Sequence, residues 1–278
     1  DRRVVEFSAL PAASARLVVA ALAPGLELSA AAGGAPDEPL AGGATRPVPA
    51  SAFVRLTVKN PARVPTAAER PVLLAEVVQV GDLITINREL VELKGGMVSG
   101  KAMDDRASVA AVAVCLEELT RLRHRWDVYA VATVQEEVGL KGAITSSFGL
   151  RPDVAVAIDV TFARQPGTPD EHTYELGKGP TIGCGPNFHP RLQEALVSAA
   201  KALEMGHHLE PAALPPGTDA RAIQISREGI PAGLVSIPVR NMHTPVETVA
   251  VKDVERAGRL LAATIARLDD DWLQTLTW

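Results

Sequence analysis

Apolar residues in the second half of the chain alternate between helical and strand-like patterns. Between residues 106 and 122 they recur every three or four positions, which predicts an amphipathic helix of about four turns. The short apolar runs at residues 128–134 and 154–158 are typical of buried strands, and residues 139–148 between them predict a second helix. A strand, a helix and a strand in this order favour a parallel sheet.

The C-terminal segment continues this alternation. Residues 190–203 predict an amphipathic helix, and Gly217-Thr218-Asp219 begins another short helix. Residues 232–237 form an apolar run that predicts a further buried strand, and residues 251–268 predict a closing helix. The second half of the sequence therefore favours an α/β domain.

The N-terminal part of the chain is rich in Ala, Pro and Gly, and its periodic patterns are short. The expected elements are a strand at 2–10, a helix or a strand at 12–22, a loop at 33–49, a strand at 51–58, and a hairpin built from 72–80 and 83–86. These elements predict a small β-rich domain.

Composition limits the classes of protein that this chain can belong to. Its 278 residues, with 47% hydrophobic and 22% charged, are typical of a globular protein that is long enough for two domains. The net charge of −5 and the lack of a basic stripe argue against nucleic-acid binding. No apolar run approaches the roughly 18 residues of a membrane span, so no membrane partner is expected. Two cysteines make no disulfide framework, which fits a cytoplasmic location.

Acidic residues and one histidine lie where predicted strands end or helices begin. They are Asp104, Glu136, Glu137, Asp159 and His243. Each alone has an ordinary structural explanation, as a helix cap, as a favourable charge at a helix N-terminus, or as a residue of a turn or loop. Together they are harder to explain by chance, because all five would have to fall at the ends of elements.

Carboxylates combined with an imidazole are the donors that zinc, cobalt or manganese ions select. A carboxylate that bridges two such ions about 3.5 to 4 Å apart lets both polarise one water, whose pKa then approaches about 7. The adjacent Glu136 and Glu137 suit this arrangement, because neighbouring side chains diverge in a non-helical turn. One of them can bind a metal while the other stays free as a base.

Five ordered stretches of the sequence resemble the tetrahedral (glutamyl) aminopeptidase family. These proteins are dinuclear-metal exopeptidases, some of which were formerly called endoglucanases. The stretches are GKAMDDR at 100–106, VQEEVGLKGA at 134–143, AIDVT at 157–161, GTDA at 217–220 and IPVRNMHTPVE at 237–247. The resemblance covers about residues 72 to 268 and is specific, because the motifs match in order and in spacing.

The resemblance implies a role for each candidate residue. Asp104 would bridge two metal ions, Glu136 would be the general base and acid, and Glu137 and Asp159 would each bind one ion. His243 would bind the ion that Glu137 holds. The implied cofactors are two divalent metal ions per subunit, with zinc or cobalt expected.

The family's fold implies a mixed, largely parallel sheet flanked by helices, with a small β-rich inserted domain. Residues 1–94 would then be the inserted domain, which helps assembly, with the N-terminal catalytic segment absent, and residues 95–278 would be the metallopeptidase catalytic domain. Many relatives form shells of twelve subunits. The expected partners are therefore peptide substrates and further copies of the chain, with a dodecamer as one candidate assembly.

The histidine content departs from the family pattern. The family's other metal-binding histidine lies in a His-x-Asp motif upstream of the inserted domain, whereas the first histidine here is His124. The ion expected on Asp104 and Asp159 therefore lacks one ligand in this chain. Either a segment is missing from this sequence or one metal is bound poorly, and the missing segment is the preferred interpretation, because the chain begins at Asp1 without Met.

The leading hypothesis is a metal-dependent aminopeptidase that removes N-terminal residues from peptides. Two alternatives remain open. One keeps the metals but makes the enzyme a carboxypeptidase or an amino-acid deacylase, which would not require a free α-amine. The other is a non-catalytic oligomeric relative that has lost one metal site.

Overall fold

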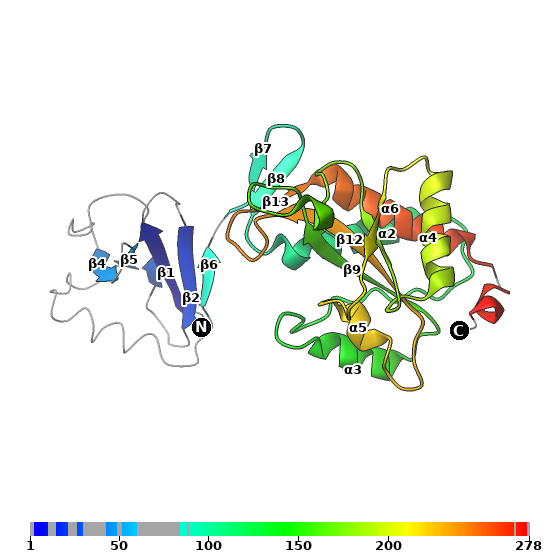
Figure 1. Cartoon of the computed structure of the whole chain (residues 1–278). Coiled ribbons are helices and arrows are strands. Elements are labelled where there is room, and N and C mark those ends of the chain that lie inside the picture. Colours follow the sequence, from blue (N-terminus) through cyan, green and yellow to red (C-terminus); the bar gives the residue numbers. More distant parts are fainter. Residues whose placement is uncertain are drawn as a thin grey trace. The chain divides into compact units, whose positions relative to one another are not determined.

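The computed structural model describes the strands at residues 3–10, 15–21, 27–29, 43–48, 52–59 and 84–87, together with residues 89–269 and 271–276 (Figure 1). The chain divides into two compact units, Asp1–Leu90 and Val91–Trp278. Every predicted site residue belongs to the second unit. The roles predicted for the two domains, assembly for 1–94 and catalysis for 95–278, remain predictions.

The described strands of the first unit form one six-stranded sheet in the order β4-β5-β3-β1-β2-β6. Its pairings are antiparallel except for the parallel pair β1–β3. The strands are β1 (Arg3–Leu10), β2 (Ala15–Ala21), β3 (Glu27–Ser29), β4 (Gly43–Val48), β5 (Ala52–Lys59) and β6 (Ile84–Asn87).

The β-rich character predicted for this region is confirmed, and one element was predicted wrongly. The strands expected at 2–10 and 51–58 are present as β1 and β5, and the ambiguous segment 12–22 contains the strand β2. The loop expected at 33–49 is wrong at its end, because β4 pairs with β5. Its Pro47 fits there because β4 is an edge strand, where the missing N–H of proline is tolerated. The first arm of the predicted hairpin, 72–80, lies outside the described residues.

The second unit contains a seven-stranded sheet in the order β11-β10-β12-β13-β8-β7, with β9 also paired to β12. The strands are β7 (Val91–Leu93), β8 (Met97–Gly100), β9 (Ala155–Phe162), β10 (Thr181–Cys184), β11 (His208–Pro211), β12 (Ala232–Arg240) and β13 (Glu247–Ala250).

The α/β class with a mixed sheet is confirmed, but the sheet is not largely parallel. Only β9–β12 and β10–β11 are parallel among the described pairs, and the other four pairings are antiparallel. Short connections explain two of the four antiparallel pairings, β7–β8 and β12–β13. The turns at 94–96 and 241–246 are too short for a crossover, so they join antiparallel neighbours.

Helices cover both faces of this sheet. They are α2 (Met103–Leu119), α3 (Lys141–Leu150), α4 (Pro190–Ala202), α5 (Asp219–Ile223) and α6 (Val251–Arg267), with two 3₁₀ turns, η1 (Asp170–His172) and η2 (Trp272–Thr275). One cluster joins α2, α4 and α6 to β12 through Val235 and Ile237, while Leu234 packs with Ala220 of α5 in another cluster. Within the described residues, none of the helices has the length and apolar character needed to cross a membrane.

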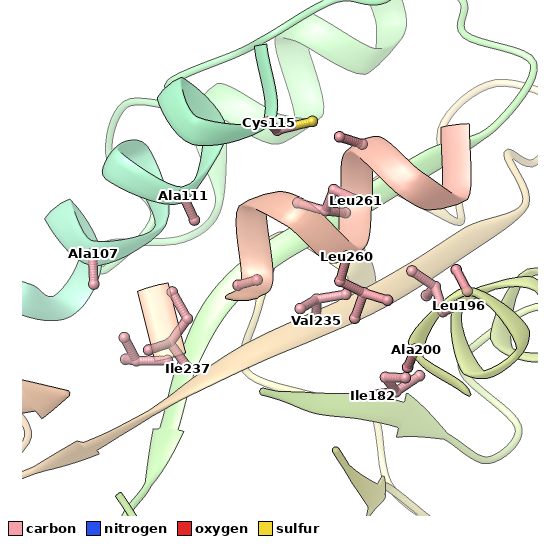
Figure 2. Close-up of a cluster of buried hydrophobic side chains, with 14 of the residues drawn as sticks. Ala107, Ala111, Cys115, Ile182, Leu196, Ala200, Val235, Ile237, Leu260 and Leu261 are labelled. Atoms are coloured by element: carbon pink, nitrogen blue, oxygen red, sulfur yellow. The ribbon is translucent and has the colours of Figure 1, made fainter. Parts of the chain in front are cut away.

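The largest core lies between α6, α2 and the central strand β12. Figure 2 shows Leu260 of α6 directed toward Val235 of β12, and both side chains are fully buried. A Cβ atom at Gly258 would lie 2.4 Å from the carbonyl oxygen of Ala111, so glycine is what lets α6 approach α2 closely. This contact holds the middle of α2 against α6.

The strand predicted at 128–134 is wrong. Residues 127–134 form no ladder with any described strand, and Tyr129 and Val134 are 67% and 66% exposed. An apolar run becomes a strand only where a neighbouring strand can accept its hydrogen bonds. The other helices and strands expected in this unit are present at or near the predicted positions.

Leu260→Ala should destabilise the second unit by about 2 to 5 kcal/mol, because it leaves a cavity in a fully buried site. Leu116→Ala on α2 is the matched control, since Leu116 is 41% exposed and its truncation leaves no cavity. Chemical denaturation measures both free energies of unfolding. Equal losses for the two variants would contradict the packing described here.

Candidate metal centre

Asp104 and Asp105 lie in the first turn of α2, where the backbone is not helical. Their φ and ψ angles depart from helical values, and the peptide between them is cis. One carboxylate oxygen of Asp105 accepts a hydrogen bond from the backbone N–H of Ser108 at 3.2 Å. Asp105 thus caps the regular part of the helix, as an N-cap side chain does. The neighbouring Asp104 approaches His243 instead.

His243 lies in the turn that joins β12 to β13. Its Nε2 atom is 3.0 Å from Oδ2 of Asp104 and 3.6 Å from Oε2 of Glu137. One ligand atom from each of these three side chains lies within 4.8 Å of the others. The Asp104 side chain is only 10% exposed, whereas those of His243 and Glu137 are 65% and 57% exposed. The group therefore forms a cation-sized cluster that is open on one side.

A second group consists of Asp104, Asp105 and Asp159, whose carboxylate oxygens also lie within 4.8 Å of one another. Asp159 is on β9, and its Oδ1 accepts the backbone N–H of Val160 at 2.7 Å. No histidine joins this group among the described residues. Asp104 belongs to both groups, which is the arrangement that a bridging carboxylate requires.

Sequence reasoning did not place Asp105 among the candidate site residues. The adjacent acidic pair was visible, but one of its members had a sufficient structural explanation. In the folded chain the same carboxyl caps the helix through one oxygen and lies in the second acidic group. The two functions are compatible because a carboxylate has two oxygens.

Glu136 lies beside this centre but outside both groups of potential ligands. Its carbonyl oxygen accepts the backbone N–H groups of Gly139 and Leu140, at 3.1 and 3.0 Å, and this turn places Glu136 and Glu137 in different surroundings. Glu137 approaches His243, whereas Glu136 belongs to neither group of potential ligands found among the described residues. The predicted division between a ligand and a free carboxylate is compatible with this geometry.

Burial raises the pKa values of the acidic groups in this centre, and their crowding adds to the shift. Burial raises the pKa of Asp104 to about 6, and the Glu137 carboxylate adds to the shift. Burial is also the main cause that raises the pKa of Asp105 to about 8 and that of Asp159 to about 9. Without a cation Asp105 and Asp159 hold protons near neutral pH, because burial disfavours their charged forms and the neighbouring carboxylates add repulsion.

Burial raises the pKa of Glu136 to about 7, and the next cause is the carboxylate of Asp219 at the start of α5. The Oδ2 atom of Asp219 accepts a hydrogen bond from the hydroxyl of Thr133 at 2.6 Å. A carboxyl with a pKa near neutrality can both accept and return a proton.

The donor set fits a divalent metal ion. Carboxylate oxygens and one imidazole nitrogen match the preferences of zinc and cobalt. A cation would stabilise the ionised carboxylates, which burial and mutual repulsion disfavour. Asp104, Glu137 and His243 would hold one ion, and Asp104 with Asp159 would hold the other. These ligand roles stay predictions.

Comparison with known proteins identifies relatives of this chain. A family model described as M42 glutamyl aminopeptidase matches residues 66–260. The lysyl aminopeptidase of Pyrococcus furiosus is 42% identical over 166 residues, which are 60% of this chain and 47% of that protein. The chain spans about half the length of the curated relatives it matches.

Solved structures share the fold. Aminopeptidase APDkam598 from the archaeon Desulfurococcus kamchatkensis is 34% identical with a TM-score of 0.69, and the match covers 99% of this chain and 71% of that one. PhTET1-12s, solved as a dodecamer, is 26% identical with a TM-score of 0.59, and the match covers 77% of this chain and 62% of that one.

The metal-free protein should lose stability as the pH rises from about 6 to about 8. The pKa values of Asp105 and Asp159 in the folded state lie above the pKa of roughly 4 of an unfolded carboxyl. The folded state therefore binds more protons than the unfolded state over this pH range, and the free energy of unfolding falls as the pH rises. Added zinc should reverse the loss, because it binds the ionised form. Thermal unfolding at both pH values, with and without zinc, measures the effect.

Asp159→Asn is the control for this titration. It removes one of the carboxyl groups whose pKa is raised, so the stability of the metal-free variant should depend less steeply on pH. Stability that rises over the same pH range in the unsubstituted protein would contradict the electrostatic description of the site.

Proposed function

Because the chain belongs to the M42 glutamyl aminopeptidase family, we propose that it is a metal-dependent aminopeptidase that removes N-terminal residues from peptides. The observation that carries the proposal is the meeting of Asp104, Glu137 and His243 from three separate parts of the chain. Glu136, a carboxyl with a pKa of about 7, lies beside them. This combination suits hydrolysis by an activated water.

Two divalent ions per subunit, zinc or cobalt, are part of the proposal. Asp104 would be shared between them, Glu137 and His243 would hold one, and Asp159 would hold the other. When bound, such ions supply Lewis-acid chemistry that polarises the scissile carbonyl and lowers the pKa of water.

Glu136 is proposed as the general base and acid. Its carboxylate takes a proton from water as the water oxygen bonds to the carbonyl carbon of the first peptide bond. The same carboxyl then gives that proton to the amine nitrogen as the C–N bond breaks. Atoms and charge balance with one water consumed for each peptide bond cleaved.

Self-association is also proposed, with a dodecamer as one candidate assembly. The support is that PhTET1-12s, which shares the fold, was solved as a dodecamer. Residues 1–94 are proposed to assist assembly and residues 95–278 to carry out catalysis. A cytoplasmic location remains a prediction.

Glu136→Gln should lower hydrolysis of aminoacyl anilides by about 10²- to 10⁴-fold, because an amide cannot accept the proton of water. Its metal content should stay unchanged, since Glu136 belongs to neither ligand group. Glu194→Gln is the control, as Glu194 forms an exposed ion pair with Arg191 on α4. Wild-type turnover by the Glu136 variant would refute the assigned role.

Substrates with a free α-amine should be hydrolysed, and the same peptides with an acetylated N-terminus should not. An aminopeptidase needs the free N-terminus, whereas a deacylase or a carboxypeptidase does not. Product analysis by mass spectrometry distinguishes these activities. Release of C-terminal residues or of acetate would replace the proposed function with the corresponding alternative.

A further inference from the structure

Glu247 is a buried carboxylate at the start of β13, and only 2% of its surface is exposed. Its Oε2 atom accepts the backbone N–H of Met103 at 2.6 Å and that of Asp104 at 3.1 Å. Its Oε1 atom accepts the backbone N–H of His243 at 2.6 Å. One side chain therefore joins the backbones of two predicted metal ligands.

These two ligands come from distant parts of the sequence. Asp104 is 143 residues from Glu247 and stands in the non-helical first turn of α2. His243 is four residues from Glu247 in a turn and has a φ of 61°, a left-handed conformation that is uncommon for residues other than glycine. Neither residue has the backbone conformation of a regular helix or strand. The hydrogen bonds that their N–H groups donate to Glu247 therefore fix their positions.

We propose that Glu247 is a positioning residue that sets the separation between Asp104 and His243, so that one divalent cation binds both. Both of its oxygens accept backbone N–H groups, so it acts through the ligands and not as a ligand. Hydrogen bonds to a charged acceptor are about twice as strong as neutral ones, which suits a group that must hold geometry. The inference rests on the proposed metal-dependent function.

A carboxylate with a purely structural role could accept the same kind of hydrogen bonds. Asp253 on α6 is such a carboxylate and serves as the control. It is also a fully buried carboxylate, and it accepts the backbone N–H groups of Gly177 and Gly179. Neither glycine is a predicted ligand. Loss of Asp253 should therefore cost stability without disturbing the metal centre.

The experiment compares Glu247→Gln with Asp253→Asn, using cobalt(II) as the probe. In Glu247→Gln an amide NH₂ replaces one acceptor and faces a backbone N–H, so the two ligands move apart. Cobalt affinity should fall by about 10- to 100-fold, and the visible absorption of the bound cobalt should change. Asp253→Asn should keep the affinity within about twofold and leave the spectrum unchanged, although both variants unfold more readily.

Glu247→Asp separates geometry from charge. It keeps the negative charge but is one methylene shorter, so it cannot reach both backbones at once. Its cobalt affinity and spectrum should shift in the same direction as those of Glu247→Gln. If Glu247→Asp matches the wild type while Glu247→Gln does not, charge alone accounts for the effect and the positioning role is overturned.

Two further outcomes distinguish this inference from the proposed function. Wild-type affinity and spectrum in both Glu247 variants, with peptide hydrolysis intact, would overturn the positioning role alone. Failure of the unsubstituted protein to bind cobalt would overturn the proposed function and this inference with it. An equal loss of affinity in Asp253→Asn would show that general destabilisation is the cause.

Discussion

Repulsion among closely spaced carboxyl groups is the constraint on which the site depends. Asp104, Asp105 and Asp159 offer oxygens within 4.8 Å of one another in a partly buried place. Like charges at this spacing persist only if protons or a cation neutralise them. The sheet, the start of α2 and the turn after β12 hold these groups together against that repulsion, so the stability of the fold and the capacity to bind a cation are connected.

Two backbone pairings bring residues of the site close together in the sheet. Parallel pairing of β9 with β12 places Asp159 opposite Ser236, four residues before the end of β12. Antiparallel pairing of β13 with β8 then places Glu247 opposite Gly100, immediately before the turn into α2. Asp159 thus lies within β9, whereas Asp104 and Glu247 lie at the starts of α2 and β13.

Much of this arrangement could be predicted from the sequence, because strong local patterns marked the elements on which the residues lie. The motifs around Asp104, Glu137 and His243 identified the residues that the structure brings together. The directions of strand pairing were harder to predict, because apolar content does not distinguish a parallel from an antiparallel neighbour. The strand predicted at 128–134 was wrong for a related reason, because an apolar run does not indicate whether a neighbouring strand is available to pair with it.

Glu247 illustrates a different limit of sequence reasoning. An acidic residue after a proline turn looks like an ordinary surface position, and its burial depends on backbone N–H groups contributed by α2, up to 144 residues away. The sequence does not mark which N–H groups will donate to Glu247, because every residue except proline has a backbone N–H. Only the folded chain reveals that this carboxylate is satisfied by the main chain.

Asp104 belongs to both groups of potential metal ligands, and this has a thermodynamic consequence. Two ions that share one carboxylate could not fill their sites independently, since each would change the electron density and the position of the oxygen atoms available to the other. Occupancy at the first site would alter the dissociation constant at the second by the same factor in either order of addition. Titration curves for such a pair belong to the coupled centre, and a single binding constant does not describe it.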